Sequence, residues 1–239
     1  MSLIDWLGPQ EWQAVRLSLW VAGVATLASL PLAVAVAWLL ARRRFPGHGL
    51  VSGIVHLPLI LPPVVTGYLL LVTFGTQGPV GSLLKPLGIV FAFRWTGAAL
   101  ACGIMAFPLM VRAIRLGFEA VDPKLEQAAA TLGAPRPWIF LTVTLPLILP
   151  AIGIISILTF VGNFNAFDLI YVTQGALAGP NFATDILGTF LYRTFFGFQL
   201  QIGDPHMGAT IATAMFGIIL LGVCFYLFAI QTRLRRYQF

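Results

Sequence analysis

The chain has 239 residues, of which 59% are hydrophobic and only 9% are charged, and it carries a formal net charge of +6. Soluble domains are roughly half apolar and about a quarter charged, so this composition excludes an ordinary soluble domain and favours a bundle of membrane helices in lipid. The few basic residues are scattered among apolar runs, so they indicate membrane topology, and no nucleic-acid partner is expected.

Five apolar stretches are long enough to cross a bilayer, which takes roughly 20 residues of helix. They are 15–41, 50–74, 95–111, 138–161 and 207–230. The sequence therefore predicts an all-α, polytopic membrane helix bundle of five transmembrane helices within residues 15–239. Residues 1–14, with Trp6, Leu7 and Trp12, predict a short interfacial segment anchored by aromatic side chains before the first span.

The basic residues fall unequally on the two sides of these five crossings. Ten of the fourteen lie on one side: Arg42, Arg43, Arg44, Arg112, Arg115, Lys124, Arg136, Arg233, Arg235 and Arg236. The other side holds Arg16, Lys85, Arg94 and Arg193. Because cytoplasmic loops collect Lys and Arg, the sequence predicts an external N-terminus and a cytoplasmic C-terminus.

The external loop 163–205 contains two apolar pieces that both carry charge in mid-run, and a sixth crossing would put the basic C-terminus outside. Apolar residues at helical spacing over 186–198 predict a short amphipathic helix at the outer interface, or dipping into it, which we interpret as a lid or vestibule element. Arg193 is a candidate to pair with one of three aspartates, namely Asp168, Asp185 or Asp204.

The second span is interrupted by three prolines, Pro58, Pro62 and Pro63. Each proline removes a backbone donor and breaks the helical ladder, which a membrane helix tolerates only where protein or water satisfies the freed groups. Two interpretations stay open: a broken helix that lines a transport pathway, or a kink that serves packing. The residues assigned to a pathway are Pro62, Pro63, Thr66 and Gly67.

The longest cytoplasmic loop, 112–137, has the pattern of a short helix with defined ends. Asp122 before Pro123 is typical of a helix start, and the alanine-rich run 125–132 favours helix. Gly133 is expected to end the helix, and the two following prolines to prevent another helix before Trp138. An exposed helix with small side chains suits insertion into a groove of a partner protein.

This loop resembles the EAA loop of type I ABC importer permeases. The resemblance lies in Glu126, Gln127, Ala128 and Ala129, in Gly133, and in Val143, Leu145 and Pro146 at the family's spacing from the glycine. The family pattern usually has glutamate at the position of Gln127, and here a glutamate stands at the adjacent Glu126.

The resemblance implies that the chain is a permease domain whose loop is a coupling helix, seated in a cleft of a separate ABC ATPase subunit. It also implies an extracytoplasmic substrate-binding protein, a second permease copy and a prokaryotic plasma (inner) membrane. The coupling residues that it indicates are Glu126, Gln127, Ala128, Ala129, Gly133, Ala134 and Pro146. No phosphate-binding loop of the form GxxxxGK[ST] occurs, so ATP hydrolysis is expected on the partner, and this chain is not expected to be an enzyme.

Two parts of the chain resemble permeases for different substrates. Residues 16–150 are similar to molybdate or tungstate permeases, most specifically at 57–68 (LPLILPPVVTGY) and 106–122 (AFPLMVRAIRLGFEAVD). From about residue 160 the chain is more similar to sugar-importer permeases, at 164–173 (FNAFDLIYVT) and 189–196 (TFLYRTFF). Molybdate or tungstate with a homodimer is the first hypothesis, and a sugar or sugar-alcohol permease is the alternative.

Other classes of function are less well supported. The three histidines do not have metal-ligand spacing, so no metal or cofactor is expected. A secondary transporter needs buried ionisable residues within its spans, and the five predicted spans contain almost none. A structural subunit without a transport path leaves the broken second span and the coupling loop unexplained.

Overall fold

The computed structural model describes residues 8–174, 182–198 and 202–231, and every regular element in these ranges is a helix. The α-helices are α1 (Pro9–Arg42), α2 (His48–Ile60), α3 (Pro63–Phe74), α4 (Pro79–Leu84), α5 (Trp95–Ala120), α6 (Pro123–Thr131), α7 (Arg136–Ile139), α8 (Leu145–Phe164), α9 (Asp168–Gln174), α10 (Leu187–Phe196) and α11 (Pro205–Phe225). Three short turns complete them: the 3₁₀ turn η2 (Lys85–Leu87) and the π-helical turns η3 (Phe140–Thr144) and η5 (Tyr226–Gln231).

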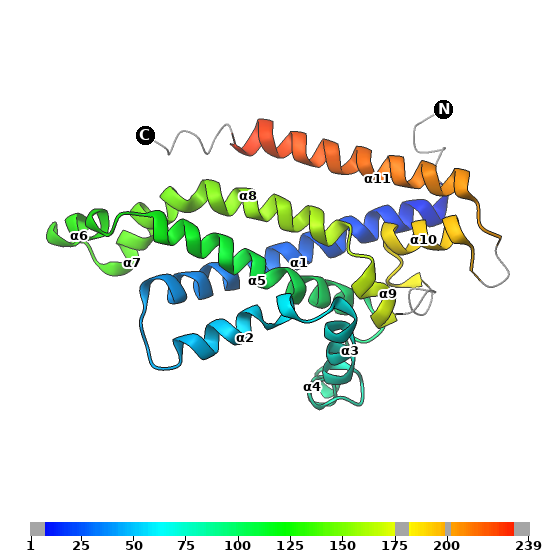
Figure 1. The fold of residues 1–239 in the computed structure, drawn as a ribbon, viewed down its shortest axis with the longest axis horizontal. Helices are drawn as coiled ribbons and strands as arrows, with labels where there is room; N and C mark the ends of the chain where they lie inside the picture. Colours follow the sequence, from blue (N-terminus) through cyan, green and yellow to red (C-terminus); the bar gives the residue numbers. More distant parts are fainter. Residues whose placement is uncertain (1–7, 175–181, 199–201, 232–239) are drawn as a thin grey trace.

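The long helices α1, α5, α8 and α11 run along one common direction, with α1, α5 and α8 in mutual contact (Figure 1). Small side chains on α1 and α5 let their backbones approach closely, as in many membrane helix pairs. A buried apolar cluster then fills the seam among α1, α5 and α8; it includes Ala33, Ala37, Met110, Ile114, Phe118, Ile148, Ile152 and Ile155.

Four helices among the described residues are long and apolar enough to cross a membrane, and they end at Arg42, Ala120, Phe164 and Phe228. The pair α2 and α3 makes a fifth crossing if its two arms are taken as one span, bent by 113° at the break. The described residues thus hold four spans, or five if the bent pair is one span, and the predicted all-α membrane helix bundle, with a break between Ile60 and Pro63, is confirmed. α1 begins at the end of the bundle that carries α10, and α11 finishes at the end that carries α6 (Figure 1).

Three predicted boundaries differ from the structure. α1 begins at Pro9, so Trp12 lies on the same helix as the first span, while Trp6 and Leu7 lie outside the described residues. α5 continues to Ala120 instead of ending near residue 111, because Ile114 and Phe118 remain in the buried core. The predicted loop 112–137 is therefore shortened at its start.

The helix after the loop also begins earlier than the two prolines predict. α7 starts at Arg136, and Pro137 occupies its first turn. A proline in a first turn lacks only an N–H group that has no helical partner in any case, so it starts a helix here and does not block one.

The predicted amphipathic helix is present as α10, which packs on α11 and α1. Leu187 and Phe190 bury its apolar side, and the backbone N–H of Leu187 donates to Ser18 Oγ on α1 at 2.8 Å. Arg193 pairs with Asp185, one of the three candidate aspartates, with 2.6 Å between Arg193 Nη2 and Asp185 Oδ2. Neither α9 nor α10 is long enough to cross a membrane.

Candidate functional site

The helix α6 is defined at both ends by local hydrogen bonds. Asp122 Oδ1 accepts from the backbone N–H of Lys124 at 2.9 Å, and Pro123 opens the helix. At the other end Gly133 has a φ of 85°, and the N–H groups of Gly133 and Ala134 donate to the carbonyls of Ala130 and Ala129 at 3.0 and 3.2 Å. This is a Schellman ending, which needs a residue that adopts left-handed φ at little cost. Both predicted ends of the helix are confirmed.

Glu126 points from α6 toward the bundle and not toward solvent. Its Oε1 accepts from Arg42 Nη2 at 2.9 Å and from Thr144 Oγ1 at 2.9 Å. The same Arg42 nitrogen also donates to the carbonyl of Val121 at 3.3 Å. One carboxylate thus joins the end of α1, the helix α6 and the π-helical turn that precedes α8.

Aromatic rings of α1, α5 and the turn η3 pack together beside this junction. Phe140, in the turn η3, stacks on Phe118 of α5 with ring centroids 6.1 Å apart and meets Trp38 of α1 edge-on at 6.1 Å. A groove of about 390 Å³ lies beside the junction, with Arg43 and Arg136 on its wall. One carboxylate therefore links α6 both to α1 and to the turn that leads into α8.

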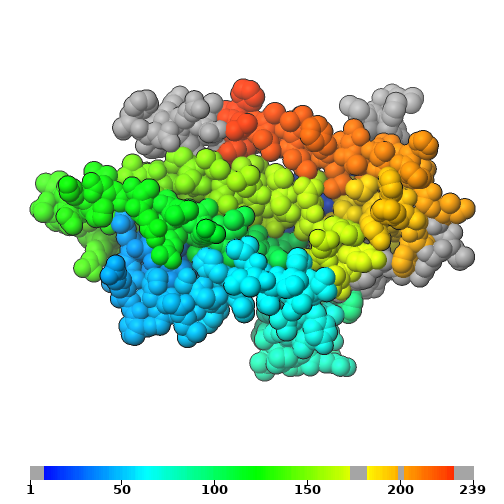
Figure 2. Space-filling view, in the orientation of Figure 1, coloured from blue at the N-terminus to red at the C-terminus, as the bar shows by residue number. Residues whose placement is uncertain are grey.

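The outer face of α6 is not covered by any other part of the chain that the structure describes. Gln127, Ala128 and Gly133 are exposed, Ala129 and Ala134 are half-buried, and the apolar Leu132 is 88% exposed. The loop forms one extremity of the molecule (Figure 2). Ala128 and Gly133 are therefore exposed, Gln127 is exposed at the rim of the groove beside the junction, and Glu126 faces inward. Pro146 lies apart, partly buried in the first turn of α8.

The four residues assigned to a pathway are also divided. Pro62 and Pro63 lie exposed at the break between α2 and α3, whereas Thr66 and Gly67 are buried one turn into α3. Among the described residues, Thr66 Oγ1 finds no hydrogen-bond partner. α3 packs against α9 and α5, and α2 packs against α5 without burying any of its own residues fully. The broken span is the least packed part of the bundle.

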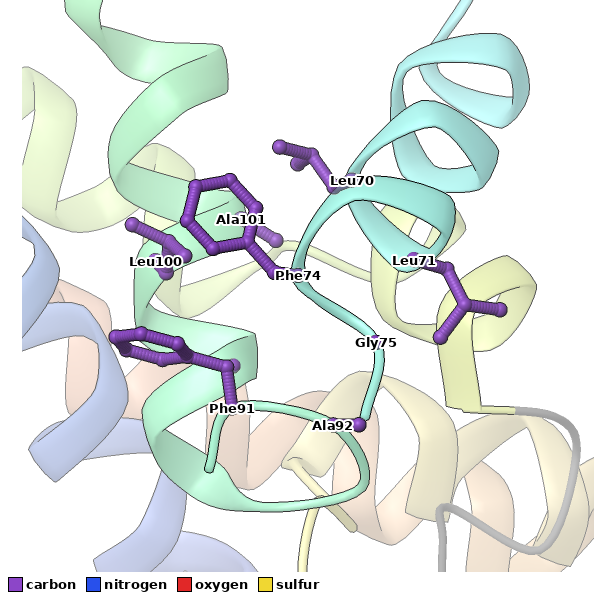
Figure 3. Close-up of a pocket in the computed structure, with 9 residues that line it drawn as sticks. Leu70, Leu71, Phe74, Gly75, Phe91, Ala92, Leu100 and Ala101 are labelled. Carbon is purple, nitrogen blue, oxygen red and sulfur yellow. The ribbon is translucent and has the colours of Figure 1, made fainter. Parts of the chain in front are cut away.

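The C-terminal end of α3 packs against α5 and the segment before it through apolar side chains. Figure 3 shows Leu70 and Phe74 of α3 on one side and Phe91 and Leu100 on the other. The rings of Phe74 and Phe91 meet edge-on with centroids 5.7 Å apart. A Cβ atom on Gly97 would collide with the carbonyl oxygen of Phe91, so glycine permits the tight entry into α5. The angle of α3 is thereby fixed.

Sequence reasoning missed two features of this site. Of the partners of Glu126, Arg42 was interpreted only as a topology signal and Thr144 was not singled out, because their contacts with Glu126 span 84 and 18 positions. Arg112 and Arg115 were placed in a cytoplasmic loop, although they lie on α5. The apolar repeat that continues through Ile114 is the signal that indicates the longer helix.

Comparison with known proteins places this geometry in a family. Residues 29–237 match the model of the binding-protein-dependent transport system inner membrane component. The molybdenum transport system permease protein ModB of Escherichia coli K12 is 56% identical over 158 residues, which are 66% of this chain and 69% of the relative. The protein of the same name from Haemophilus influenzae is 50% identical over 170 residues, 71% of this chain and 74% of the relative.

A more distant relative matches over more of the chain. The sulfate transport system permease protein CysT of Salmonella typhimurium LT2 is 30% identical over 229 residues, 96% of this chain and 78% of the relative. The matches to ModB cover 66% and 71% of this chain.

Solved structures agree in fold. A bacterial ABC transporter that imports the acidic polysaccharide alginate superimposes with a TM-score of 0.72 at 21% identity, covering 97% of this chain and 81% of that one. The inward-facing MetNI methionine ABC transporter gives a TM-score of 0.70 at 19% identity, covering 99% of each chain. The chain belongs to the family of binding-protein-dependent transport system inner membrane components and is a multi-pass permease subunit of an ABC importer.

Proposed function

We propose that this permease carries a molybdate or tungstate oxyanion and is driven through α6 by a separate ABC ATPase. The observation that carries the substrate is the 56% identity to a molybdenum permease over two thirds of the chain, against 30% to a sulfate permease. Both named substrates are tetrahedral dianions, so the two relatives indicate one chemical class of cargo.

The geometry of α6 supports the coupling part of the proposal. The outer face, with Gln127, Ala128 and Leu132, would sit in the ATPase cleft, and Glu126 would hold the helix to the bundle from behind. ATP-driven closure of two ATPases would then move two permeases as rigid bodies. ATP hydrolysis belongs to the partner in this scheme, and this chain contributes the pathway.

The remaining partners follow from the arrangement of the spans. Five crossings do not enclose a pathway, so we infer a two-fold homodimer in the lipid bilayer, with the broken span, including Pro62, Pro63, Thr66 and Gly67, toward the pathway. The end with α6 and most of the basic residues would be cytoplasmic. The N-terminal end, with α9 and α10, would face an extracytoplasmic substrate-binding protein.

A sugar or sugar-alcohol permease is the second candidate. It is favoured by the resemblance of residues 164–173 and 189–196 to sugar importers, outside the stretch of molybdate-permease character. If the chain combines parts of two permease types, it transports only if both parts switch together between the same two conformations.

Co-purification and transport separate the two candidates. The tagged chain would be purified in detergent with a molybdate-type or a sugar-type ABC ATPase and then reconstituted with the matching binding protein and ligand. We expect a stable complex, ATPase stimulation and uptake of radiolabelled molybdate with the molybdate-type set alone. Stimulation by the sugar-type set alone would favour a sugar as the cargo. Association with neither ATPase would contradict the coupling proposal.

A further inference from the structure

A polar groove of about 410 Å³ lies between α2 and α5, apart from the outer face of α6. One water molecule occupies roughly 30 Å³, so the groove has room for an anion together with part of its hydration shell. Its walls are Ser52, Gly53 and His56 on α2, and Arg112, Arg115, Leu116 and Glu119 on α5.

The two walls lie at one level of the bundle. His56 is eight residues beyond the start of α2 at His48, and Arg112 is eight residues before the end of α5 at Ala120. At about 1.5 Å per residue, each lies roughly 12 Å from the α6 end of its helix. The imidazole of His56 and the guanidinium of Arg112 therefore lie at the same level of the groove.

The charges in the groove leave one cation without a partner. Arg115 Nε donates to Glu119 Oε1 at 2.7 Å, so these two charges compensate each other. Within the part of the chain that the structure describes, Arg112 makes no hydrogen bond or ion pair. The groove therefore carries one excess positive charge at Arg112.

His56 is oriented so that one ring nitrogen remains available. Its Nδ1 lies 2.7 Å from the carbonyl oxygen of Ser52, and because a carbonyl only accepts, Nδ1 carries the proton. The Nε2 atom is then free to accept a hydrogen bond, for example from a water molecule in the hydration shell of an anion. The Ser52 hydroxyl lies one turn away on the same helix.

Gly53 keeps the groove open. A Cβ atom built at this position meets nothing within 4 Å, so the space beside the backbone of α2 is unfilled. The lining holds no Trp, Tyr or Phe side chain on which the face of a sugar would pack. The combination of an unpaired guanidinium, hydrogen-bonding groups and open space suits a small anion better than a neutral carbohydrate.

We propose that the groove is an oxyanion-binding site in the half of the pathway nearer α6, taking a tetrahedral dianion. Arg112 supplies the charge, the Ser52 hydroxyl donates a hydrogen bond, and His56 Nε2 accepts one from a water molecule of the hydration shell, so that the oxyanion has a binding position on the α6 side of the broken span before it leaves. The assignment rests on the proposed function, because it places the oxyanion cargo at named residues.

The test uses the permease in complex with its ATPase, without the binding protein, and tungstate as the probe. Loss of a charge-assisted contact weakens binding by about tenfold, so Arg112→Gln is expected to raise the tungstate dissociation constant by that factor in calorimetry. Arg112→Lys, which keeps the charge, is expected to retain most of the affinity. Arg16→Gln, an exposed arginine outside the groove, is the matched control and is expected to bind as the parent does.

A second variant tests the groove without removing a charge. Gly53→Leu fills the open space and is expected to lower molybdate uptake by the full reconstituted importer by about tenfold, whereas Gly53→Ala is expected to be nearly unchanged. Unchanged tungstate affinity in Arg112→Gln, with normal uptake in Gly53→Leu, would overturn the site while parental uptake still supports the proposed function. If the parent transports no oxyanion, the proposed function fails and the site fails with it.

A lipid phosphate is the other source of this ligand chemistry. Calorimetry in nanodiscs of neutral phosphatidylcholine and of anionic phosphatidylglycerol distinguishes the two sources. The proposal predicts the same tenfold effect of Arg112→Gln in both lipids. An effect confined to phosphatidylglycerol and independent of tungstate would assign Arg112 to a lipid headgroup and overturn the proposal.

Discussion

The two ends of the bundle are both fixed to α1, but they differ in what they leave uncovered. At one end Glu126 of α6 accepts a hydrogen bond from Arg42, the last residue of α1. At the other end the N-terminus of α10 donates to Ser18, near the start of α1. Each connecting segment is therefore rigidly placed by a polar contact with the same long helix.

The two ends differ in how they place their charged side chains. α10 folds its only charged residue inward: Arg193 and Asp185 are both buried, and the guanidinium lies over the rings of Phe182 and Phe190 at 4.5 and 5.1 Å. α6 instead presents Leu132 almost fully to solvent. Phe196 of α10 is also exposed, at 68%, so the difference lies in the charges: the α10 end pairs its arginine within the chain, whereas the exposed apolar residue of α6 lies beside the junction at Glu126.

The largest expected effect lies at the buried pair. Arg193→Ala leaves Asp185 without its cation, and burial already raises the pKa of that carboxyl above its ordinary value. A loss of roughly 3–5 kcal/mol in the free energy of unfolding is expected. Thermal unfolding of the purified protein measures it, and Arg193→Met combined with Asp185→Leu is expected to recover most of the loss. If Arg193→Ala alone is as stable as the parent, the buried pair does not stabilise the α10 end.

The junction at α6 is expected to matter for coupling more than for folding. Glu126→Ala removes two hydrogen bonds to one carboxylate, a loss of about 1.5–3 kcal/mol in holding α6 to the bundle. ATPase stimulation by substrate is expected to fall while membrane insertion is retained. In a double-mutant cycle with Arg42→Ala, purely additive losses of stimulation would contradict the junction.

Backbone strain at the end of α6 gives a smaller effect. Gly133→Val places a β-branched residue at a φ of 85°, at a cost of roughly 1–3 kcal/mol, and is expected to shift the loop and weaken ATPase co-purification. Gly133→Asn tolerates the left-handed conformation better and serves as the control. Equal recovery of the ATPase with both variants would show that the loop geometry is irrelevant to assembly.

The smallest effect on stability, and the sharpest contrast, is expected at Leu132. Leu132→Ser removes an exposed apolar side chain, so the free energy of unfolding is expected to change by at most about 0.5 kcal/mol. Association with the ATPase is expected to weaken by more than tenfold if Leu132 fills a pocket of the partner. Unchanged association, measured by pull-down at several ATPase concentrations, would remove Leu132 from the interface.

Sequence alone predicts those features that depend on neighbouring residues. The five apolar stretches, both ends of α6 at Asp122 and Gly133, and the short amphipathic helix now seen as α10 were all predicted from local patterns. The pairing of Arg193 was predicted only as one of three aspartates, because spacing along a loop does not fix which carboxylate folds back onto the helix.

Features that depend on distant residues escaped prediction. The junction at Glu126 joins residues up to 84 positions apart, so no local pattern reveals it. The end of α5 was misplaced because Arg112 and Arg115 suggested a loop, whereas burial of Ile114 and Phe118 against other helices keeps the chain helical. Tertiary packing therefore overrode a charge signal at the position where the further site is inferred.

Coupling to the ATPase requires above all that the exposed side of α6, with Gln127 at its rim, lies in the cleft of that subunit. Site-directed cross-linking tests this directly: Gln127→Cys in a background without Cys102 and Cys224 is combined with cysteines placed along the cleft of the ATPase. We predict a disulfide cross-link from Gln127→Cys that depends on nucleotide state, and none from Phe196→Cys, an exposed position at the opposite end. Cross-linking from Phe196→Cys, with none from Gln127→Cys in any nucleotide state, would contradict the account.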